Sequence, residues 1–129
     1  AVSPAGAMGL AQFMPATWTE WGQGLDPFDP EANLGAGARY MAWIRTWLES
    51  QGVPPTWGAT LAAYNWGIGN VRNAYRQYGS SWLEHAPAET RYYVAELAPK
   101  YREAAGELPR PPRVLVLIFA VLLAAWYLR

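Results

Sequence analysis

Apolar residues recur every three or four positions along most of this chain, which is the spacing of one face of a helix. The clearest case predicts a long helix from about Asn33 to Gln51. Its shared apolar face comprises Leu34, Ala38, Met41, Ile44 and Leu48. No stretch alternates apolar and polar residues with a period of two, so a β-rich fold is not expected. The pattern therefore predicts an all-α protein.

Shorter helices are expected on both sides of this long one. Their ranges are about 6–14, 17–21, 56–65, 71–78 and 88–105. Pro15 is expected to end or kink the first, and Thr17 is expected to cap the second. The glycines of "NWGIGN" (65–70) separate the third helix from the fourth, and 79–81 is expected to be a turn. Helices joined by Gly/Pro-rich loops thus account for residues 1–105.

The C-terminal part has a different composition. Residues 106–113, "GELPRPPR", are predicted to be a stiff linker. The run "VLVLIFAVLLAAWYL" (114–128) is wholly apolar and would span roughly 22 Å as a helix, against a hydrocarbon core of roughly 30 Å. Flanking arginines and the Trp126-Tyr127 pair suit the membrane interface. We therefore predict an apolar transmembrane or membrane-anchoring helix, whose orientation the flanking charges leave open.

Charge and composition exclude several classes of function. Ten basic and ten acidic residues give a net charge of zero, with no basic run, so nucleic-acid binding is not expected. The absence of Cys excludes disulfides and a thiol nucleophile. The single histidine, His85, cannot form a multi-His metal site and is expected on the surface. Neither a metal nor another cofactor is predicted.

Three segments carry candidate chemistry. They are "SPAGAMGLAQFMP" (3–15), "AAYNWGIGNV" (62–71) and "ETRYYVAEL" (89–97). Gln12 offers an amide, Tyr64 a hydroxyl and Asn65 a second amide, all suited to hydrogen bonds with a ligand. Glu89 begins a helix, where the dipole favours an acidic side chain even without a functional role. The chain also has eight Trp, which suit either a core or a groove that stacks on sugar rings.

These segments resemble the motifs of the SLT-type lytic transglycosylases, which are relatives of goose-type lysozyme. The family's G-L-M-Q motif corresponds to Gly9-Leu10-Ala11-Gln12, and its A-Y-N-A-G motif corresponds to Ala63-Tyr64-Asn65-Trp66-Gly67. Its E-T-R-x-Y-V motif is intact at 89–94, and the resemblance covers about residues 1–105. It implies a lysozyme-like helical domain with a glycan-binding groove.

The resemblance also implies an activity and a set of site residues. Family members cleave the β-1,4 bond between N-acetylmuramic acid and N-acetylglucosamine in peptidoglycan, leaving a 1,6-anhydro-muramyl product. Substrate contacts would come from Ser3, Gln12, Met14, Tyr64 and Asn65. Tyr64 would also support the catalytic acid, and Glu89 would hold the far wall of the groove. No metal or cofactor is implied.

The family's catalytic Glu is expected to be missing from this chain. It precedes the Ser that matches Ser3, at a position before Ala1. Glu89 has only a supporting role in the family, and no other Glu stands in the family's context. Two further departures are Ala11, where Met is common, and Trp66, where a small residue is usual. We therefore expect an N-terminally truncated domain with negligible lytic activity.

Two other hypotheses remain open. One is a non-catalytic module that binds peptidoglycan and is anchored in the membrane, with the groove residues kept and the acid absent. The other is a membrane-inserting structural protein in which 114–128 matters most. Peptidoglycan glycan strands and, through 114–128, a membrane are the expected partners. The expected location is the cell envelope, with the domain on the periplasmic or outer face of the membrane, or a bacteriophage.

Overall fold

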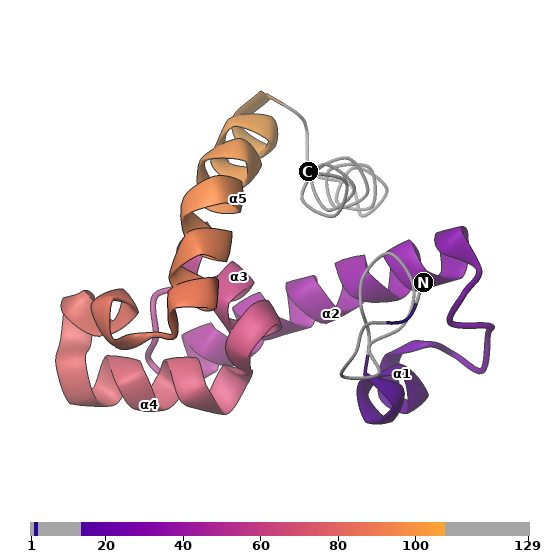
Figure 1. Ribbon diagram of the computed structural model, residues 1–129, viewed down its shortest axis with the longest axis horizontal. Coiled ribbons are helices and arrows are strands. Elements are labelled where there is room, and N and C mark those ends of the chain that lie inside the picture. The colour runs from indigo at the N-terminus through magenta and orange to yellow at the C-terminus, as the bar shows by residue number, and fades with distance from the viewer. Residues whose placement is uncertain (1, 3–13, 108–129) are drawn as a thin grey trace. The chain divides into compact units, whose positions relative to one another are not determined.

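The computed structural model describes Val2 and residues 14–107. The elements of this part are all helical, which confirms the all-α class for the described residues. They are α1 (Pro15–Trp21), α2 (Pro30–Ser50), α3 (Trp57–Trp66), α4 (Ile68–Tyr78), the 3-10 helix η1 (Gly79–His85) and α5 (Ala88–Glu107) (Figure 1). The described residues form two compact units, one up to Tyr40 and one of Met41–Gly106. Each is considered by itself below.

The first unit begins with α1, and its start differs from the prediction. Pro15 is the first residue of this helix, Met14 is its N-cap, and Thr17 lies inside it. Proline is well suited to a first helical position because its φ angle is already helical and its missing N–H has no partner there anyway. The prediction that Thr17 caps this helix is therefore wrong. The predicted end or kink of a preceding helix at Pro15 stays a prediction. The predicted helix over 6–14 falls outside the described residues apart from Met14.

Trp18 is the buried residue of α1, and it contacts the loop that follows this helix. Its side chain is buried, and the indole N–H donates a hydrogen bond to the carbonyl of Leu25 at 3.0 Å. Gly22 packs directly against the indole ring. At the entrance of α2, the fully buried Asn33 donates from Nδ2 to the carbonyl of Pro27 at 2.9 Å. The loop between α1 and α2 is thus held by side-chain bonds at both ends.

The long helix α2 confirms the main sequence prediction. It begins at Pro30, a few residues before the predicted start at Asn33, and ends at Ser50. Of its predicted apolar face, Leu34 is half-buried and the other members are buried, namely Ala38, Met41, Ile44 and Leu48. The helical period therefore identified the buried side of α2 correctly.

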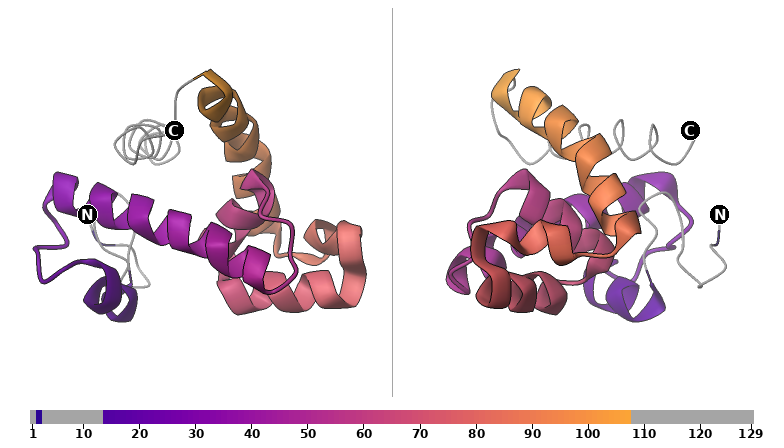
Figure 2. Two further views of the ribbon diagram at one scale, coloured as in Figure 1. Left: turned by 180° about the vertical axis from the view of Figure 1, so that it is seen from behind. Right: turned by 60° about the vertical axis from the view of Figure 1, so that its left-hand side comes forward.

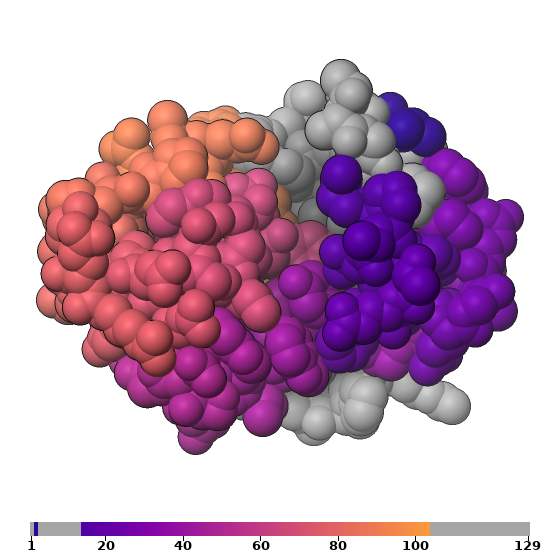
Figure 3. All heavy atoms as spheres, turned by 90° about the horizontal axis from the view of Figure 1, so that it is seen from below, coloured from indigo at the N-terminus to yellow at the C-terminus, as the bar shows by residue number. Residues whose placement is uncertain are grey.

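The second unit contains the C-terminal part of α2 and the helices α3, α4, η1 and α5. Thr56 caps α3, since its hydroxyl accepts a hydrogen bond from the N–H of Ala59 at 3.0 Å. α4 packs against both α3 and η1. It occupies a broad part of the face of this unit seen from below (Figure 3). α5 starts beside these helices, and its C-terminal end projects away from them in each ribbon view (Figure 2).

Two predicted boundaries in this unit need correction. α4 begins at Ile68 rather than Val71, because Gly67 alone makes the break between α3 and α4, with φ of 116°. The predicted turn at 79–81 is the start of η1, which continues to His85. A short 3-10 helix of this kind has no strong periodic signal, so the apolar pattern did not reveal it. His85 is exposed, as expected.

The core of the second unit combines aliphatic and aromatic side chains. Trp57 packs against Tyr101 with ring centroids 5.1 Å apart, and the Arg45 guanidinium lies 4.1 Å from the centre of the Trp57 ring. Burial raises the pKa of Tyr93 and of Tyr101, and the neighbouring Tyr93 raises that of Tyr101 further. Fully buried aliphatic members of this core are Ile44, Leu48, Val53, Leu61, Val71 and Leu97.

The last helix extends slightly beyond its predicted end. α5 includes Pro99 and ends at Glu107, so the first two residues of the predicted linker 106–113 are helical. The predicted apolar helix at 114–128 lies outside the described residues. Within the described range, none of the helices has the length and apolar character that a membrane span requires.

Candidate functional site

Two of the candidate segments meet in the second unit through a side-chain hydrogen bond. The hydroxyl of Thr90, in the first turn of α5, donates to Oδ1 of Asn65, near the end of α3, at 2.8 Å. Thr90 is 2% exposed, whereas Asn65 is half-buried. The bond thus fixes an amide at the edge of the core, with its Nδ2 group still available as a donor.

The sequence around Asn65 places two polar side chains at the end of one helix. Tyr64 and Asn65 occupy the last turn of α3, and both are half-buried. Gly67 follows with a positive φ angle, which ends α3 before α4 begins. Its N–H donates a hydrogen bond to the carbonyl of Ala63 at 2.8 Å. Trp66 is the next residue and is half-buried. It is the residue that stands where the A-Y-N-A-G motif usually has a small side chain. A phenol and an amide are therefore presented together where the helix stops.

The first turn of α5 presents its side chains in two directions. Thr90 faces the interior, while its neighbours Glu89 and Arg91 are exposed. Glu89 stands in the first helical turn, where the partial positive charge of the helix terminus favours a carboxylate. The hydrogen bond between Thr90 and Asn65 links the helix turn that carries Glu89 to the turn that carries Tyr64. The structure thus brings together the segments of three predicted site residues: Tyr64, Asn65 and Glu89.

The remaining predicted site residues belong to the N-terminal part of the chain. Met14 lies in the first unit, where it is 44% exposed and its carbonyl accepts the N–H of Trp18 at 2.9 Å. Ser3 and Gln12 lie outside the described residues. Their contribution to a site, and that of Met14, remain predictions.

Carboxylates of the described part are poorly placed to act as a buried acid. Between Glu20 and Glu103, Glu96 is half-buried and the other Glu side chains are exposed. A general acid in a glycosidase needs a raised pKa, which burial among apolar walls provides. Over the same described range, the structure contains no cluster of three His, Cys, Asp or Glu residues that would hold a metal ion.

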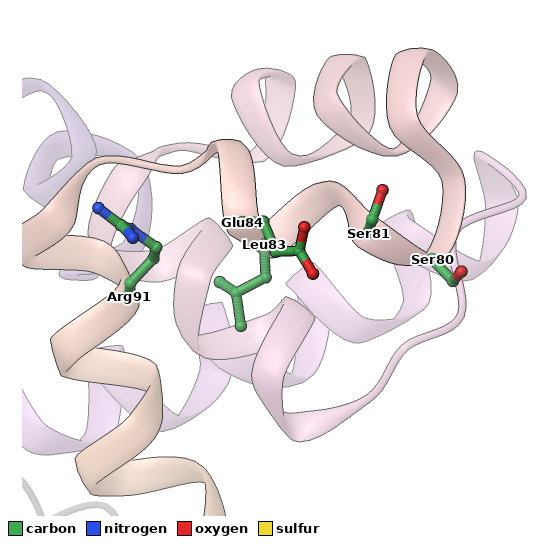
Figure 4. A pocket seen from close by; sticks show the side chains of 5 residues that line it. All are labelled: Ser80, Ser81, Leu83, Glu84 and Arg91. Atoms are coloured by element: carbon green, nitrogen blue, oxygen red, sulfur yellow. The ribbon is translucent and has the colours of Figure 1, made fainter.

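One concave surface of the second unit was not anticipated from the sequence. It has a volume of about 370 Å³ and is lined by residues of η1 together with Arg91 of α5 (Figure 4). Beside it, Tyr78 and His85 stack with ring centroids 3.5 Å apart. Thr90 belongs to the intact motif at 89–94, but the sequence does not reveal its bond to Asn65 or this concavity, because both depend on contacts between different helices.

Comparison with known proteins identifies the family. The sequence model described as "Transglycosylase SLT domain" matches residues 1–85. The chain is also 35% identical over 110 residues to the membrane-bound lytic murein transglycosylase F of Pasteurella multocida (strain Pm70). That match covers 73% of this chain and 21% of the relative, so the chain spans about a fifth of the relative's length. No solved structure matches significantly.

The chain therefore belongs to the transglycosylase SLT domain family. This confirms the resemblance drawn from the three motifs. The match begins at residue 1 and includes the segments of Gln12 and Tyr64.

Proposed function

We propose that this domain binds peptidoglycan glycan strands and belongs to an enzyme that cleaves their β-1,4 bond between N-acetylmuramic acid and N-acetylglucosamine. The product would be a 1,6-anhydro-muramyl end. The observation that carries the proposal is the match of residues 1–85 to the transglycosylase SLT domain model. The hydrogen bond between Thr90 and Asn65 supports it, because it holds the two C-terminal motif segments next to each other.

Each site residue has a role that its chemistry supports. Asn65 uses Oδ1 to hold Thr90, so its Nδ2 group is the donor for a carbonyl or hydroxyl oxygen of the glycan. Tyr64, in the preceding position, would hydrogen-bond the catalytic acid. Glu89 would accept hydrogen bonds from sugar hydroxyls at the far wall of the groove. Ser3, Gln12 and Met14 would complete the substrate contacts.

The reaction itself needs one carboxylic acid. A Glu placed before Ser3, as in the family, would give its proton to the glycosidic oxygen while the bond to the muramyl C1 breaks. The resulting carboxylate would then take the proton of the muramyl 6-hydroxyl, whose oxygen bonds to C1. The acid is regenerated, and no water is consumed. General acid–base catalysis of this kind contributes typically about 10² to 10⁴ in rate.

A second candidate function is a peptidoglycan-binding module without catalysis. It differs from the first candidate in needing no carboxylic acid, since the amide and hydroxyl contacts alone would hold a glycan strand. This module would keep the amide and hydroxyl contacts of Asn65 and Tyr64. It would retain affinity for glycan strands but leave them intact.

Digestion of purified peptidoglycan distinguishes the two candidates. We expect the chain 1–129 to bind insoluble peptidoglycan and release no anhydro-muropeptides, as measured by turbidity and product mass. A version extended upstream to include a Glu in the family's position should release them, and its Glu→Gln variant should not. Without anhydro-muropeptides from the extended version, the catalytic proposal fails. If the Tyr64→Phe and Gln12→Ala variants bind as well as the unchanged chain, the proposed roles of these residues fail.

The domain organisation is proposed as follows. Residues 1–105 form the SLT domain, 106–113 connect it to the C-terminal run, and 114–128 anchor the protein in a membrane of the cell envelope. The strongly apolar composition of 114–128 supports this anchor. The full chain should partition into the detergent phase, and a chain ending at Pro109 should remain in the aqueous phase. Equal partitioning of both would exclude the anchor.

A further inference from the structure

One side of the second unit presents two tryptophans of α2 next to each other. Trp43 and Trp47 are four positions apart and therefore lie on the same side of the helix. Their ring centroids are 6.3 Å apart, with an angle of 25° between the rings. Trp43 is 37% exposed, and Trp47 is half-buried. The surface of this unit thus includes a pair of large aromatic side chains in partial contact with water.

Two arginines of α4 border this tryptophan pair. The Arg72 guanidinium lies 5.4 Å from the centre of the Trp47 ring. One turn further along α4, Arg76 donates from Nη2 to Oε1 of Gln51, which follows α2 directly, at 3.3 Å. Arg72 is half-buried and Arg76 is exposed. Trp43, Trp47, Arg72 and Arg76 together are called the α2–α4 face below.

The α2–α4 face is positively charged. Both of its arginines come from α4, which contains no acidic residue. On α2, the acid nearest to Trp47 in sequence is Glu49, two positions further on. Two positions along a helix correspond to a rotation of about 200°, so Glu49 lies on another side of α2. The indole rings and the guanidinium groups therefore share a surface to which these two helices add no carboxylate.

This combination of side chains fits the surface of an anionic lipid bilayer. Indole rings favour the headgroup level of a bilayer because they have a large apolar area and one N–H donor. Guanidinium groups are attracted to anionic lipids and form paired hydrogen bonds with phosphate. A soluble anion would bind the arginines and leave the tryptophans in water, whereas a bilayer surface contacts both.

The C-terminal part of the sequence would keep a bilayer within reach of this face. The second unit ends at Gly106, and the apolar run proposed as an anchor starts at Val114. Fully extended, the chain from Gly106 to Val114 spans at most about 29 Å. An anchor at 114–128 would therefore hold the second unit close to the membrane. Such a tether strengthens a weak surface contact by raising its effective concentration.

We propose that the α2–α4 face lies on the surface of an anionic bilayer. Trp43 and Trp47 occupy the headgroup level, and Arg72 and Arg76 contact lipid phosphates. The inference rests on the proposed membrane anchor for its tether, although the contact itself needs only this face. The second unit then keeps one orientation on the membrane instead of turning freely about the chain that connects it to the anchor.

A single fluorescent label tests this contact. The chain has no cysteine, so Thr46→Cys places one label on the exposed side of α2, between Trp43 and Trp47 in sequence. Ala88→Cys, at an exposed position in α5, is the control. The full chain is reconstituted with phosphatidylcholine vesicles, with or without phosphatidylglycerol. We expect brominated lipids to quench the label at position 46 in the anionic vesicles and to leave the label at position 88 unquenched.

Variants assign the contact to the charged and the aromatic side chains. Arg76→Gln should reduce the population in contact with the anionic bilayer about fivefold, as expected for one cation near such a surface. Trp43→Ala should also reduce the quenching. Arg91→Gln, which removes an exposed charge from α5, is the matched control and should change nothing. Salt at 1 M should abolish the contact, because the screening length is then about 3 Å. Circular dichroism verifies that each variant is folded.

The outcomes separate this inference from the proposed anchor. Suppose the full chain floats with both kinds of vesicle, but the label at position 46 is not quenched, or is quenched equally in Arg76→Gln and Trp43→Ala. The membrane face is then wrong, while the anchor stands. Flotation with anionic vesicles alone, lost in Arg76→Gln, would show that the face binds lipid and that the anchor fails. If the label at position 46 is already shielded from water without lipid, a second copy or another segment of this chain covers the face, and the proposal is wrong.

Discussion

The hydroxyl of Thr90 lies 2.8 Å from Oδ1 of Asn65 and donates a hydrogen bond to it, although the two residues are 25 positions apart. Thr90 stands in the first turn of α5, and Asn65 in the last turn of α3. The bond is partly buried, with the Thr90 hydroxyl on the interior side, so water competes with it less than with an exposed bond. It fixes the separation of two helix ends that carry Tyr64 and Glu89.

Replacing Thr90 by valine should therefore affect both stability and binding. Valine keeps the shape but removes the donor, leaving a partly buried amide oxygen unpaired, at a cost of about 1–2 kcal/mol. Denaturant unfolding measures this loss, and binding to insoluble peptidoglycan should weaken because Asn65 is no longer held. Thr90→Ser, which retains the hydroxyl, should recover most of the affinity.

Thr46→Val is the matched control for this substitution. The Thr46 side chain is exposed, and its hydroxyl bonds only to its own helix, at Ala42. Its loss should change the free energy of unfolding by less than about 0.5 kcal/mol. Equal effects of the two valine substitutions would show that the bond between α3 and α5 has no special importance.

Gly67 and Gly69 offer a second matched pair, in the turn that ends α3. Gly67 has φ of 116° and ψ of 142°, a backbone conformation that side chains with a Cβ rarely adopt. Gly67→Ala should destabilise the protein by about 1–3 kcal/mol and displace Asn65. Gly69 lies within α4 with space for a methyl group, so Gly69→Ala should stabilise it by about 0.5–1 kcal/mol. Thermal melting measures both, and a stabilising Gly67→Ala would contradict the argument.

Buried tyrosines predict a loss of stability at alkaline pH. Burial raises the pKa of Tyr101 well above its ordinary value of 10.0, and the nearby Tyr93 raises it further. The unfolded chain therefore releases these protons at lower pH than the folded protein. Stability is fully present below about pH 10 and declines as pH rises toward the folded-state pKa, by up to about 1.4 kcal/mol per pH unit for each group.

Tyr101→Phe tests this pH dependence. Phenylalanine preserves the ring packing against Trp57 and removes the titrating group. The slope of unfolding free energy against pH should therefore become shallower above pH 10 in the variant, while the slope below this pH should not change. Urea unfolding at several pH values gives both slopes. Identical slopes in the two proteins above pH 10 would exclude a contribution from Tyr101.

The sequence predicted those features that depend on local pattern. The helical period located the buried residues Met41, Ile44 and Leu48 of α2. The motif order names Tyr64, Asn65 and Glu89 as site residues, and this stays a prediction. Local pattern also caused the error at Thr17, because a threonine near the start of a helix resembles an N-cap, whereas here Pro15 already occupies the first helical position.

The sequence did not predict features that depend on contacts between distant segments. Thr90 has no visible role until α5 is placed beside α3, where its hydroxyl reaches Asn65. The same holds for Glu84 and Arg91, which line one concavity although they belong to η1 and α5. The spacing of apolar residues along the chain predicts which face of a helix is buried. Which helices contact each other is determined by packing, and the spacing does not show it.

Gly22 provides a test of packing in the first unit. A Cβ at this position would overlap the indole ring of Trp18, which cannot move away easily because its N–H is bonded to Leu25 at 3.0 Å. Gly22→Ala should therefore cost about 1–3 kcal/mol, the usual cost of overpacking. Gly35→Ala is the control: its Cβ would lie 3.3 Å from Nη1 at the end of the long, exposed Arg39 side chain, which can shift slightly while its Nη2 keeps the bond to Trp21, and alanine is the better helix former inside α2. Guanidinium unfolding of the two variants should show a loss for the first and a gain of about 0.5–1 kcal/mol for the second. A neutral Gly22→Ala would mean that Trp18 packs more loosely than this arrangement requires.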